Sequence, residues 1–439
     1  MTVRLLILGI NYAPEIISTA VYTTGLAEAM VDRGHEVRVV TAHPYYPAWK
    51  RSPGYPAFWY RREAPRPGLD VTHCPHYVPA RPTGARRILH HASFALTALP
   101  VALWTAIRHR PDAVFVAAPA LVAAPVGWLA ARLGGGKAWL HIQDYEVEAA
   151  FATGLLKEDS RIGRAARGFE RWILRRFDKV SSISAPMLAK LTEQGIPAER
   201  IFELRNWADL SRVVPLTGPS PLKAELGITT PHVALYSGNI ANKQGLEIIP
   251  AAARLLAHRS DLTFAIFGDG PFLAELKNLS QGLSNIQFFP LQPRDRLSEL
   301  VGMATVHLLP QIAGAADLVL PSKLTNMLAS GRPVLATAEP GTALAGEVAG
   351  CGEITPPGDA ATLASALERL LDDPARREAL GAAARVRALD RWDGSRILDR
   401  FAAELHHMTG IAKAGAPAPS DEPGADRTGP DLMMKRNEP

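Results

Sequence analysis

Three short segments place small or cationic residues where an α/β protein can bind an anion. The first, residues 237–245, lies between a predicted strand and a predicted helix and contains Gly238, Asn239 and Lys243. Glycine lets the backbone approach a phosphate, a helix N-terminus favours an anion, and Lys243 would add a positive charge. A glycine turn beside a solvated lysine fits equally well, so this segment alone leaves both interpretations open.

The second segment consists of Gly268, Asp269 and Gly270, which follow the apolar run 263–267. A flat ring or a ribose could lie against so small a loop. The alternative is an ordinary turn with Pro271 at the first position of the next helix.

The third segment begins a predicted helix that runs from Ser322, with Pro321 beside its cap, to Gly331. Lys323 stands in the first turn, where the helix dipole is already positive. An exposed lysine there costs only about 0.3–1 kcal/mol. A bound phosphate or carboxylate would turn this local conflict into a favourable contact, which indicates a functional site.

A histidine and two acids mark the end of the predicted strand 138–142 in the first half of the chain. His141 lies near its C-terminal edge, and Asp144 and Glu146 follow. Open α/β sheets bind ligands outside the carboxyl ends of their strands, so we expect His141 to face a cleft and to act in catalysis. A structural histidine is the alternative.

Composition and absent motifs exclude several classes of protein. The 439 residues predict two or three domains, and 47% hydrophobic with 21% charged residues supports a large core. Cys74 and Cys351 cannot form a disulfide framework, and no Cys/His cluster has zinc spacing. Dinucleotide, P-loop and Asp-x-Asp metal motifs are missing. We expect a cytosolic protein without cofactor or metal, whose run Leu5–Ile10 is a buried strand and not a signal peptide.

Apolar runs flanked by helical stretches occur in two series, as in parallel sheets covered on both faces. The predicted strands are 3–10, 36–41, 113–117, 138–142 and 180–184, then 232–237, 262–268, 285–289, 306–309 and 333–336. Two such series predict two Rossmann-like, doubly wound domains that face a central cleft.

Segments rich in proline and glycine predict the domain boundaries. The expected parts are a first domain 1–207, a linker 208–222, a second domain 223–390, a C-terminal helix 391–410 that could cross back, and a disordered tail 411–439. The tail has five prolines and no aromatic residue.

The motifs, in this order, resemble those of the retaining GT-B glycosyltransferases of family 4. The similarity runs from Leu5 to about Phe401 and includes 11–15, 34–37, 206–207, 268–270 and 329–334. Segments 44–49, 141–147 and 321–324 are similar to the colanic-acid-type branch, which contains fucosyltransferase-like enzymes of exopolysaccharide biosynthesis.

The resemblance implies a metal-independent hexosyltransferase that moves a sugar from a nucleotide-diphosphate sugar to a lipid-linked saccharide. The donor would lie on the second domain and the acceptor on the first. Lys243, Lys323 and helix N-termini would stabilise the leaving diphosphate, and His141 would lie near the sugar. A pair of glutamates in the family matches Asp317, one position out of register, and Asn326.

The implied donor positions are Gly238, Asn239, Lys243, Gly268, Asp269, Gly270, Pro321, Ser322, Lys323 and Asn326. The implied acceptor-side positions are Glu15, Tyr45, Tyr46, Trp49 and Asp144. Asn239 stands where the family has an arginine. A nucleotide-sugar epimerase and a non-catalytic nucleotide-sugar-binding protein remain as alternatives.

Residues 71–111 contain no acid, and within them the run 92–107 carries no charge. The run is short of the ~20 residues that span a bilayer. Five arginines accompany it: Arg81, Arg86, Arg87, Arg108 and Arg110. We therefore expect peripheral attachment to the anionic, cytoplasmic face of the inner membrane, with a buried helix as the alternative. Aromatic and basic residues in 45–62 would bind the lipid pyrophosphate or the interface, and the α/β context argues against nucleic acid.

Overall fold

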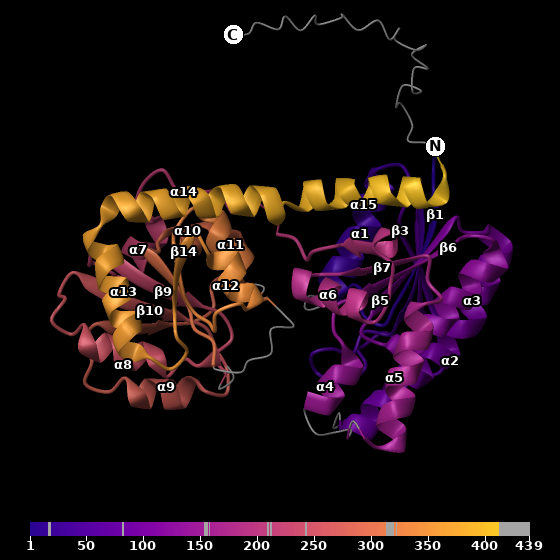
Figure 1. Cartoon of the computed structure of the whole chain (residues 1–439), viewed down its shortest axis with the longest axis horizontal. Coiled ribbons are helices and arrows are strands. Elements are labelled where there is room, and N and C mark those ends of the chain that lie inside the picture. Colours follow the sequence, from indigo (N-terminus) through magenta and orange to yellow (C-terminus); the bar gives the residue numbers. More distant parts are fainter. Residues whose placement is uncertain are drawn as a thin grey trace, which may run out of the picture.

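The apolar runs form the strands of two separate sheets, each covered by helices (Figure 1). The computed structural model describes residues 1–15, 19–80, 83–152, 157, 159–208, 210, 213–241, 244–312, 320–321 and 323–411. The predicted tail lies outside these residues from position 412 onward.

The first sheet has eight strands in the order β3-β4-β2-β1-β5-β6-β7-β8, parallel except for the β3–β4 pair. Their bounds are β1 (Arg4–Gly9), β2 (Glu36–Ala42), β3 (Arg61–Arg66), β4 (Leu69–Cys74), β5 (Ala113–Ala118), β6 (Lys137–Ile142), β7 (Lys179–Ser182) and β8 (Ile201–Glu203). The strand order reverses between β1 and β5, so this is where an open sheet leaves room for a ligand.

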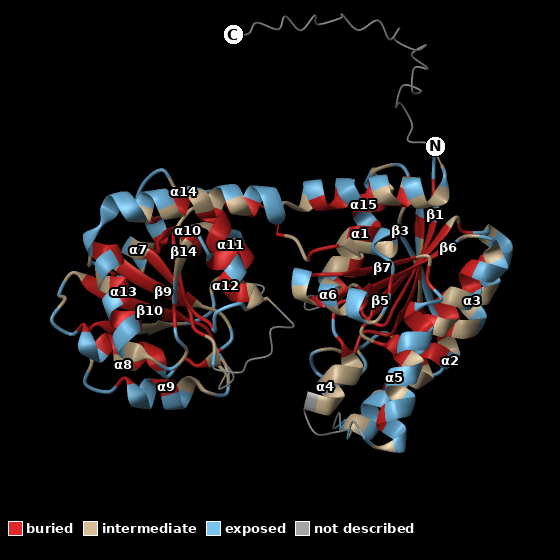
Figure 2. Ribbon diagram, viewed as in Figure 1, coloured by how far each residue is buried: buried red, intermediate tan, exposed pale blue. Residues whose placement is uncertain are grey.

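Helices cover both faces of this sheet. They are α1 (Thr19–Asp32), α2 (Gly84–His109), α3 (Ala124–Gly134), α4 (Glu146–Ala152), α5 (Arg161–Leu174) and α6 (Ala185–Glu193). Side chains alternate along β1: Leu5 and Ile7 pack on the α1 side, and Leu6 and Leu8 pack on the α2 and α3 side. Figure 2 shows the strands buried and the outer helix faces exposed.

The second sheet has six parallel strands in the order β11-β10-β9-β12-β13-β14. Their bounds are β9 (His232–Ser237), β10 (Leu262–Phe267), β11 (Ile286–Phe289), β12 (Val306–Leu309), β13 (Val334–Thr337) and β14 (Gly352–Thr355). The helices are α7 (Pro221–Glu225), α8 (Ile248–Leu255), α9 (Leu273–Leu279), α10 (Leu297–Gly302), α11 (Lys323–Ala329), α12 (Ala343–Val348), α13 (Ala360–Asp372) and α14 (Pro374–Arg391).

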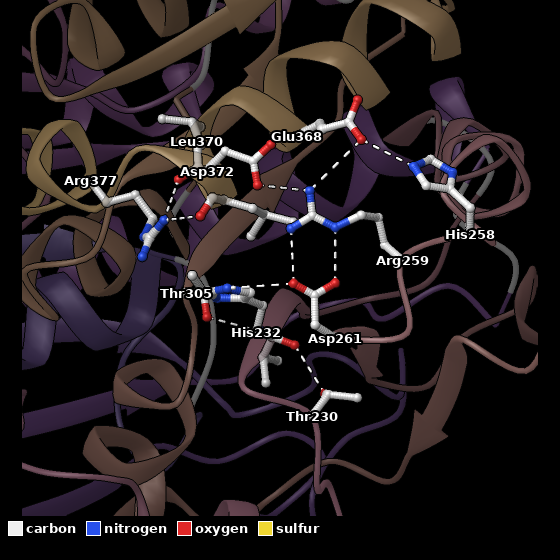
Figure 3. Close-up of polar contacts among 12 residues, drawn as sticks. Thr230, His232, His258, Arg259, Asp261, Thr305, Glu368, Leu370, Asp372 and Arg377 are labelled. Atoms are coloured by element: carbon white, nitrogen blue, oxygen red, sulfur yellow. Dashed lines mark hydrogen bonds and ion pairs between the residues drawn. The ribbon is translucent and has the colours of Figure 1, made fainter.

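An ion-pair network ties the second domain together at the amino end of its sheet (Figure 3). Arg259 binds both carboxylate oxygens of Asp261 at 2.9 Å and reaches Asp372 of α13 at 2.9 Å. His258 contacts Glu368 of the same helix at 3.1 Å. This network lies away from the carboxyl ends of the strands, where a ligand would bind.

The last helix, α15 (Gly394–Thr409), returns to the first domain. Phe401 packs against Phe115 and Trp139 at 5.5 and 4.7 Å between ring centroids. Figure 1 shows α14 on one domain and α15 on the other. The outgoing and returning segments lie side by side, because the Ala208 amide donates to the Trp392 carbonyl at 2.9 Å.

Two helices differ from their predicted form. The helix that follows the 237–245 segment, expected over Gln244–Ala257, begins only at Ile248, because Gly245 adopts a positive φ of 67° that interrupts it. The run 92–107 is the greater part of one longer helix, α2, which continues through Pro100.

Candidate active site

The loops that follow β9 and β10 interlock through their backbones. The Ile240 amide donates to the Asp269 carbonyl at 2.9 Å. A Cβ on Gly268 would lie 2.0 Å from the Gly238 oxygen, and one on Gly270 would lie 2.2 Å from the Ile240 oxygen. The glycines are therefore required by contact between the two loops, a reason that the sequence analysis did not consider.

Lys323, the first residue of α11, lies against this pair of loops. A Cβ on Gly238 would be 3.4 Å from its Nζ, so the lysine covers the glycine. Its Nζ lies 2.8 Å from the Tyr236 hydroxyl and 3.4 Å from Gln244 Oε1. Burial lowers the pKa of Lys323 to about 7. Within the described residues, no carboxylate forms an ion pair with it, so none of these residues balances its charge.

The other predicted donor residues surround this lysine or lie outside the described chain. The Asn239 carbonyl accepts a hydrogen bond from Tyr236 at 2.7 Å, and the Pro321 carbonyl accepts one from the Leu324 amide at 2.9 Å. Asn326 is half-buried one turn along α11. Lys243, Asp317 and Ser322 fall outside the described residues. Tyr236 and Gln244 were missed, because a tyrosine in an apolar strand carries no motif.

His141 is a core residue of β6, and the expectation that it faces a cleft is wrong for this structure. Its ring is only 3% exposed and stacks on Phe115 at 5.7 Å. Its Nδ1 lies 2.9 Å from the Ser181 hydroxyl of β7, which also accepts from Trp139 at 2.8 Å. Burial lowers the pKa of His141 to about 3, so the ring is neutral. The strand ends at Ile142 as predicted, but the histidine ring packs into the domain core.

On the acceptor side, Glu15 connects the loops that follow β1 and β2. Its carboxylate accepts the backbone amides of Tyr45 and Tyr46 and the side-chain amide of Asn11, each at 2.8 Å. Burial raises the pKa of Glu15 despite these bonds. Glu15 thus fixes the position of the two tyrosines.

Histidines surround Tyr45, and no sequence motif predicted them there. Tyr45 lies 4.5 Å from His90 and 5.2 Å from His76 between ring centroids, and Trp49 lies 5.4 Å from His90. Burial lowers the pKa of His76 to about 3 and that of His90 to about 4. Tyr45 and His90 are buried, so the cluster is an uncharged part of the domain core, and these histidines add no positive charge.

Asp144 lies near a second acid, the partly buried Glu146. Its side chain is exposed, yet the surrounding protein and the Glu146 carboxylate raise its pKa to about 6. Glu146 contacts His91 Nδ1 at 3.1 Å and accepts the Leu121 amide at 2.8 Å. Burial acts to raise the pKa of Glu146, but the His91 contact outweighs it and lowers the pKa. Asp144 is thus a weakly acidic carboxyl group without an ion-pair partner among the described residues, and it can accept a hydrogen bond from a hydroxyl group.

The chain matches two family models and is similar in sequence to a bacterial glycosyltransferase. Residues 19–207 match the glycosyl transferase 4-like domain, and residues 221–387 match glycosyl transferases group 1. The chain is 42% identical to the colanic acid biosynthesis glycosyl transferase WcaI of Escherichia coli (strain K12), over 78% of this chain and 84% of that protein. The chain belongs to the group 1 glycosyltransferases.

Solved structures give this glycosyltransferase its fold class. Sucrose-phosphate synthase of Thermosynechococcus elongatus superposes with a TM-score of 0.69 at 18% identity, covering 93% of this chain and all of that one. Anabaena HepE in complex with UDP superposes with a TM-score of 0.63 at 17% identity, covering 92% of this chain and all of that one. The GT-B fold, with its two Rossmann-like domains, is confirmed.

The two matched regions divide the site. The group 1 region contains the interlocked loops and Lys323. The 4-like region contains Tyr45, Tyr46 and Asp144, and Glu15 lies just before it. In the described part of the chain, no group of three or more His, Cys, Asp or Glu residues is placed to hold a metal ion.

Proposed function

We propose that this glycosyltransferase transfers a sugar from a nucleotide-diphosphate sugar to a lipid-linked saccharide in the biosynthesis of a colanic-acid-type exopolysaccharide. The observation that carries the proposal is the environment of Lys323. This largely buried cation of α11 lies against the Gly238 loop and has no carboxylate partner among the described residues. Such a group gains most from an anionic ligand, since its own desolvation is then offset.

A donor diphosphate fits this position chemically. The charge that develops on the leaving diphosphate would be stabilised by Lys323, assisted by Lys243 from the first loop, without a metal ion. We propose transfer with retention of configuration, as the family resemblance implies. The names of two similar proteins support the proposal: WcaI for the pathway, and HepE, crystallised with UDP, for the donor class.

The acceptor would lie over the carboxyl ends of the first sheet. There Glu15 holds the backbone of Tyr45 and Tyr46. Tyr45 is buried in the core, so the partly exposed Tyr46 and Trp49 would contact a sugar ring. Asp144 would accept a hydrogen bond from the reacting hydroxyl, because its exposed oxygens have no ion-pair partner among the described residues.

Helix α2 would attach the enzyme to the cytoplasmic face of the membrane. Among the described residues it is the one helix long and apolar enough to cross a bilayer, but Phe94, Ala98 and Ala102 pack into the domain core. Its outer face exposes Leu96 and Trp104, at 71% and 60%. A helix that is buried along one side and apolar along the other is suited to lie in the interface.

The neighbouring aromatic loop extends this surface. The Tyr60 hydroxyl donates to the Thr97 carbonyl of α2 at 2.9 Å, which places Phe58 and Trp59 close to the helix. Phe58 and Trp59 are 85% and 75% exposed. Arg86 and Arg108 add positive charge at the two ends of α2, which favours an anionic lipid surface.

A transfer assay tests the proposed function. Purified enzyme is incubated with GDP-, UDP- and dTDP-sugars, with and without a polyprenyl-diphosphate-linked saccharide. We expect release of the nucleoside diphosphate from one donor, together with a lengthened lipid-linked product. Conversion of the nucleotide sugar into an isomer without acceptor, or binding with no turnover under any pairing, would contradict the proposal.

A further inference from the structure

Tyr236 makes two different contacts with Lys323. Its hydroxyl oxygen lies 2.8 Å from Lys323 Nζ, and the same ammonium lies 4.1 Å from the centroid of its ring. The tyrosine is fully buried near the end of β9, directly before the loop that contains Gly238. A buried strand residue thus contacts the ammonium of Lys323 with both its hydroxyl group and its ring.

The hydroxyl group can serve Lys323 only as an acceptor. It has one proton, which it donates either to the Asn239 carbonyl at 2.7 Å or to Gln244 Oε1. Its lone pairs are therefore available to the ammonium. Burial raises the pKa of Tyr236, so the group stays a neutral phenol.

Gln244 completes this arrangement. Its Oε1 contacts the Tyr236 hydroxyl and lies 3.4 Å from Lys323 Nζ. An aromatic ring, a phenol and an amide can hold an ammonium in place without cancelling its charge. A carboxylate in any of these places would hold the lysine more tightly but would compete with an anionic ligand.

We propose that Tyr236 and Gln244 are positioning residues that hold the Lys323 ammonium over the Gly238 loop for the diphosphate of the nucleotide donor. The inference rests on the proposed function for the identity of the ligand. It assigns these two residues a task that acts entirely through Lys323, and this dependence can be tested.

The test is a double-mutant cycle with Tyr236→Phe and Lys323→Met. Binding of UDP, GDP, ADP and dTDP is measured by calorimetry between pH 6.5 and 9. Tyr236→Phe keeps the ring and removes the acceptor, so the preferred nucleoside diphosphate should bind about tenfold more weakly, as for a lost hydrogen bond to a charged group. In the Lys323→Met background the same change should have less than a twofold effect, since the group it positions is gone.

Gln244→Glu is the second variant. A carboxylate 3.4 Å from the ammonium would neutralise Lys323, so we expect weaker diphosphate binding and a higher pKa of the lysine. Arg259→Met, in the ion-pair network at the other end of the sheet, is the matched control and should leave affinity unchanged. Thermal unfolding of each variant checks the fold.

Several outcomes would overturn the inference. One is an equal loss of affinity on Tyr236→Phe with and without Lys323, which would mean a merely structural role. Another is unchanged affinity in both Tyr236→Phe and Gln244→Glu. If the wild type binds no nucleoside diphosphate, the proposed function fails instead. The pKa of Lys323, measured in the ligand-free enzyme by NMR of ¹³C-labelled lysine, then decides the inference: it must fall in Tyr236→Phe and rise in Gln244→Glu.

Discussion

The largely buried Lys323 weakens the ligand-free protein, as is common for residues kept for binding. Its pKa is 10.5 when solvated and about 7 in the fold, so between these values the unfolded state binds the extra proton and stability rises with pH. Below pH 7 the buried ammonium destabilises the folded state by its full amount, on the order of a few kcal/mol. Lys323→Met should raise the melting temperature by several degrees at pH 6.5 and by little at pH 10. An unchanged or lower melting temperature at pH 6.5 would show that the ammonium is not desolvated.

The same lysine should make diphosphate binding pH-dependent. The diphosphate needs the protonated amine, which is fully present below pH 7 and lost above it. The affinity for the preferred nucleoside diphosphate should therefore be constant up to about pH 7 and then fall by up to about tenfold per pH unit. Calorimetry in buffers of different ionisation enthalpy should detect proton uptake at pH 8. A flat profile to pH 9 in the wild type, matching that of Lys323→Met, would rule out this coupling.

Glu15 offers a prediction on the acceptor side. Glu15→Ala removes the acceptor for two backbone amides and should release the loop with Tyr45 and Tyr46. We expect transfer to the lipid-linked acceptor to fall at least tenfold, while nucleoside diphosphate binding on the other domain stays within twofold. Glu15→Gln, which keeps one carbonyl oxygen for both amides, is the matched control and should retain most activity. Equal losses in binding and transfer would argue against an acceptor-side role.

At the scale of the elements, α2 separates two contributions to membrane binding. Replacing Leu96, Trp104 and Ile107 by Gln removes exposed apolar area, so flotation with both phosphatidylglycerol-containing and phosphatidylcholine liposomes should fall. Replacing Arg86 and Arg108 by Gln should reduce only the anionic component, which high salt also screens.

A control for these liposome experiments is available on the other domain. Val386 and Leu389 of α14 are also exposed, and their replacement by Gln should change nothing. Wild-type protein that stays unbound with anionic liposomes at low salt would show that α2 is an ordinary helix of the domain.

The elements also show what can be predicted from the sequence. Strands β9 and β12 have the predicted bounds, because buried parallel strands are continuous apolar runs. Strand β3 was missed, since Arg61–Arg66 is a charged edge strand with no apolar period. The loops that we propose for the donor were singled out in the sequence by their glycines and by Lys323, and their role stays a prediction. The direction of single side chains could not be predicted from the sequence, because it depends on the register of each strand. Tyr236 of β9 contacts Lys323, whereas His141 of β6 is buried in the core.

At the scale of the whole molecule, the described residues join the two domains through two adjacent segments of the chain and through an ionic group. Arg205, directly after β8, pairs with Glu347 of α12 at 2.9 Å, and both side chains are only 7% exposed. Arg205 also pairs with Glu203 at 2.7 Å, and Arg391 reaches Glu347 at 2.8 Å. This group connects the first domain to the domain that contains Lys323 and the interlocked loops.

Binding and turnover should therefore respond differently when this group is broken. Glu347→Gln keeps the shape but removes the negative charge shared by Arg205 and Arg391. We expect nucleoside diphosphate affinity within twofold of wild type, since the donor loops and Lys323 are untouched, and a several-fold lower kcat for transfer, since the two halves of the site lose their fixed relation. Glu353→Gln is the control, because Glu353 pairs with Arg369 and Arg376 inside the same domain. A parallel loss of donor affinity and turnover in Glu347→Gln, or an equal loss in Glu353→Gln, would show that the charge stabilises the second domain alone and does not hold the two domains in register.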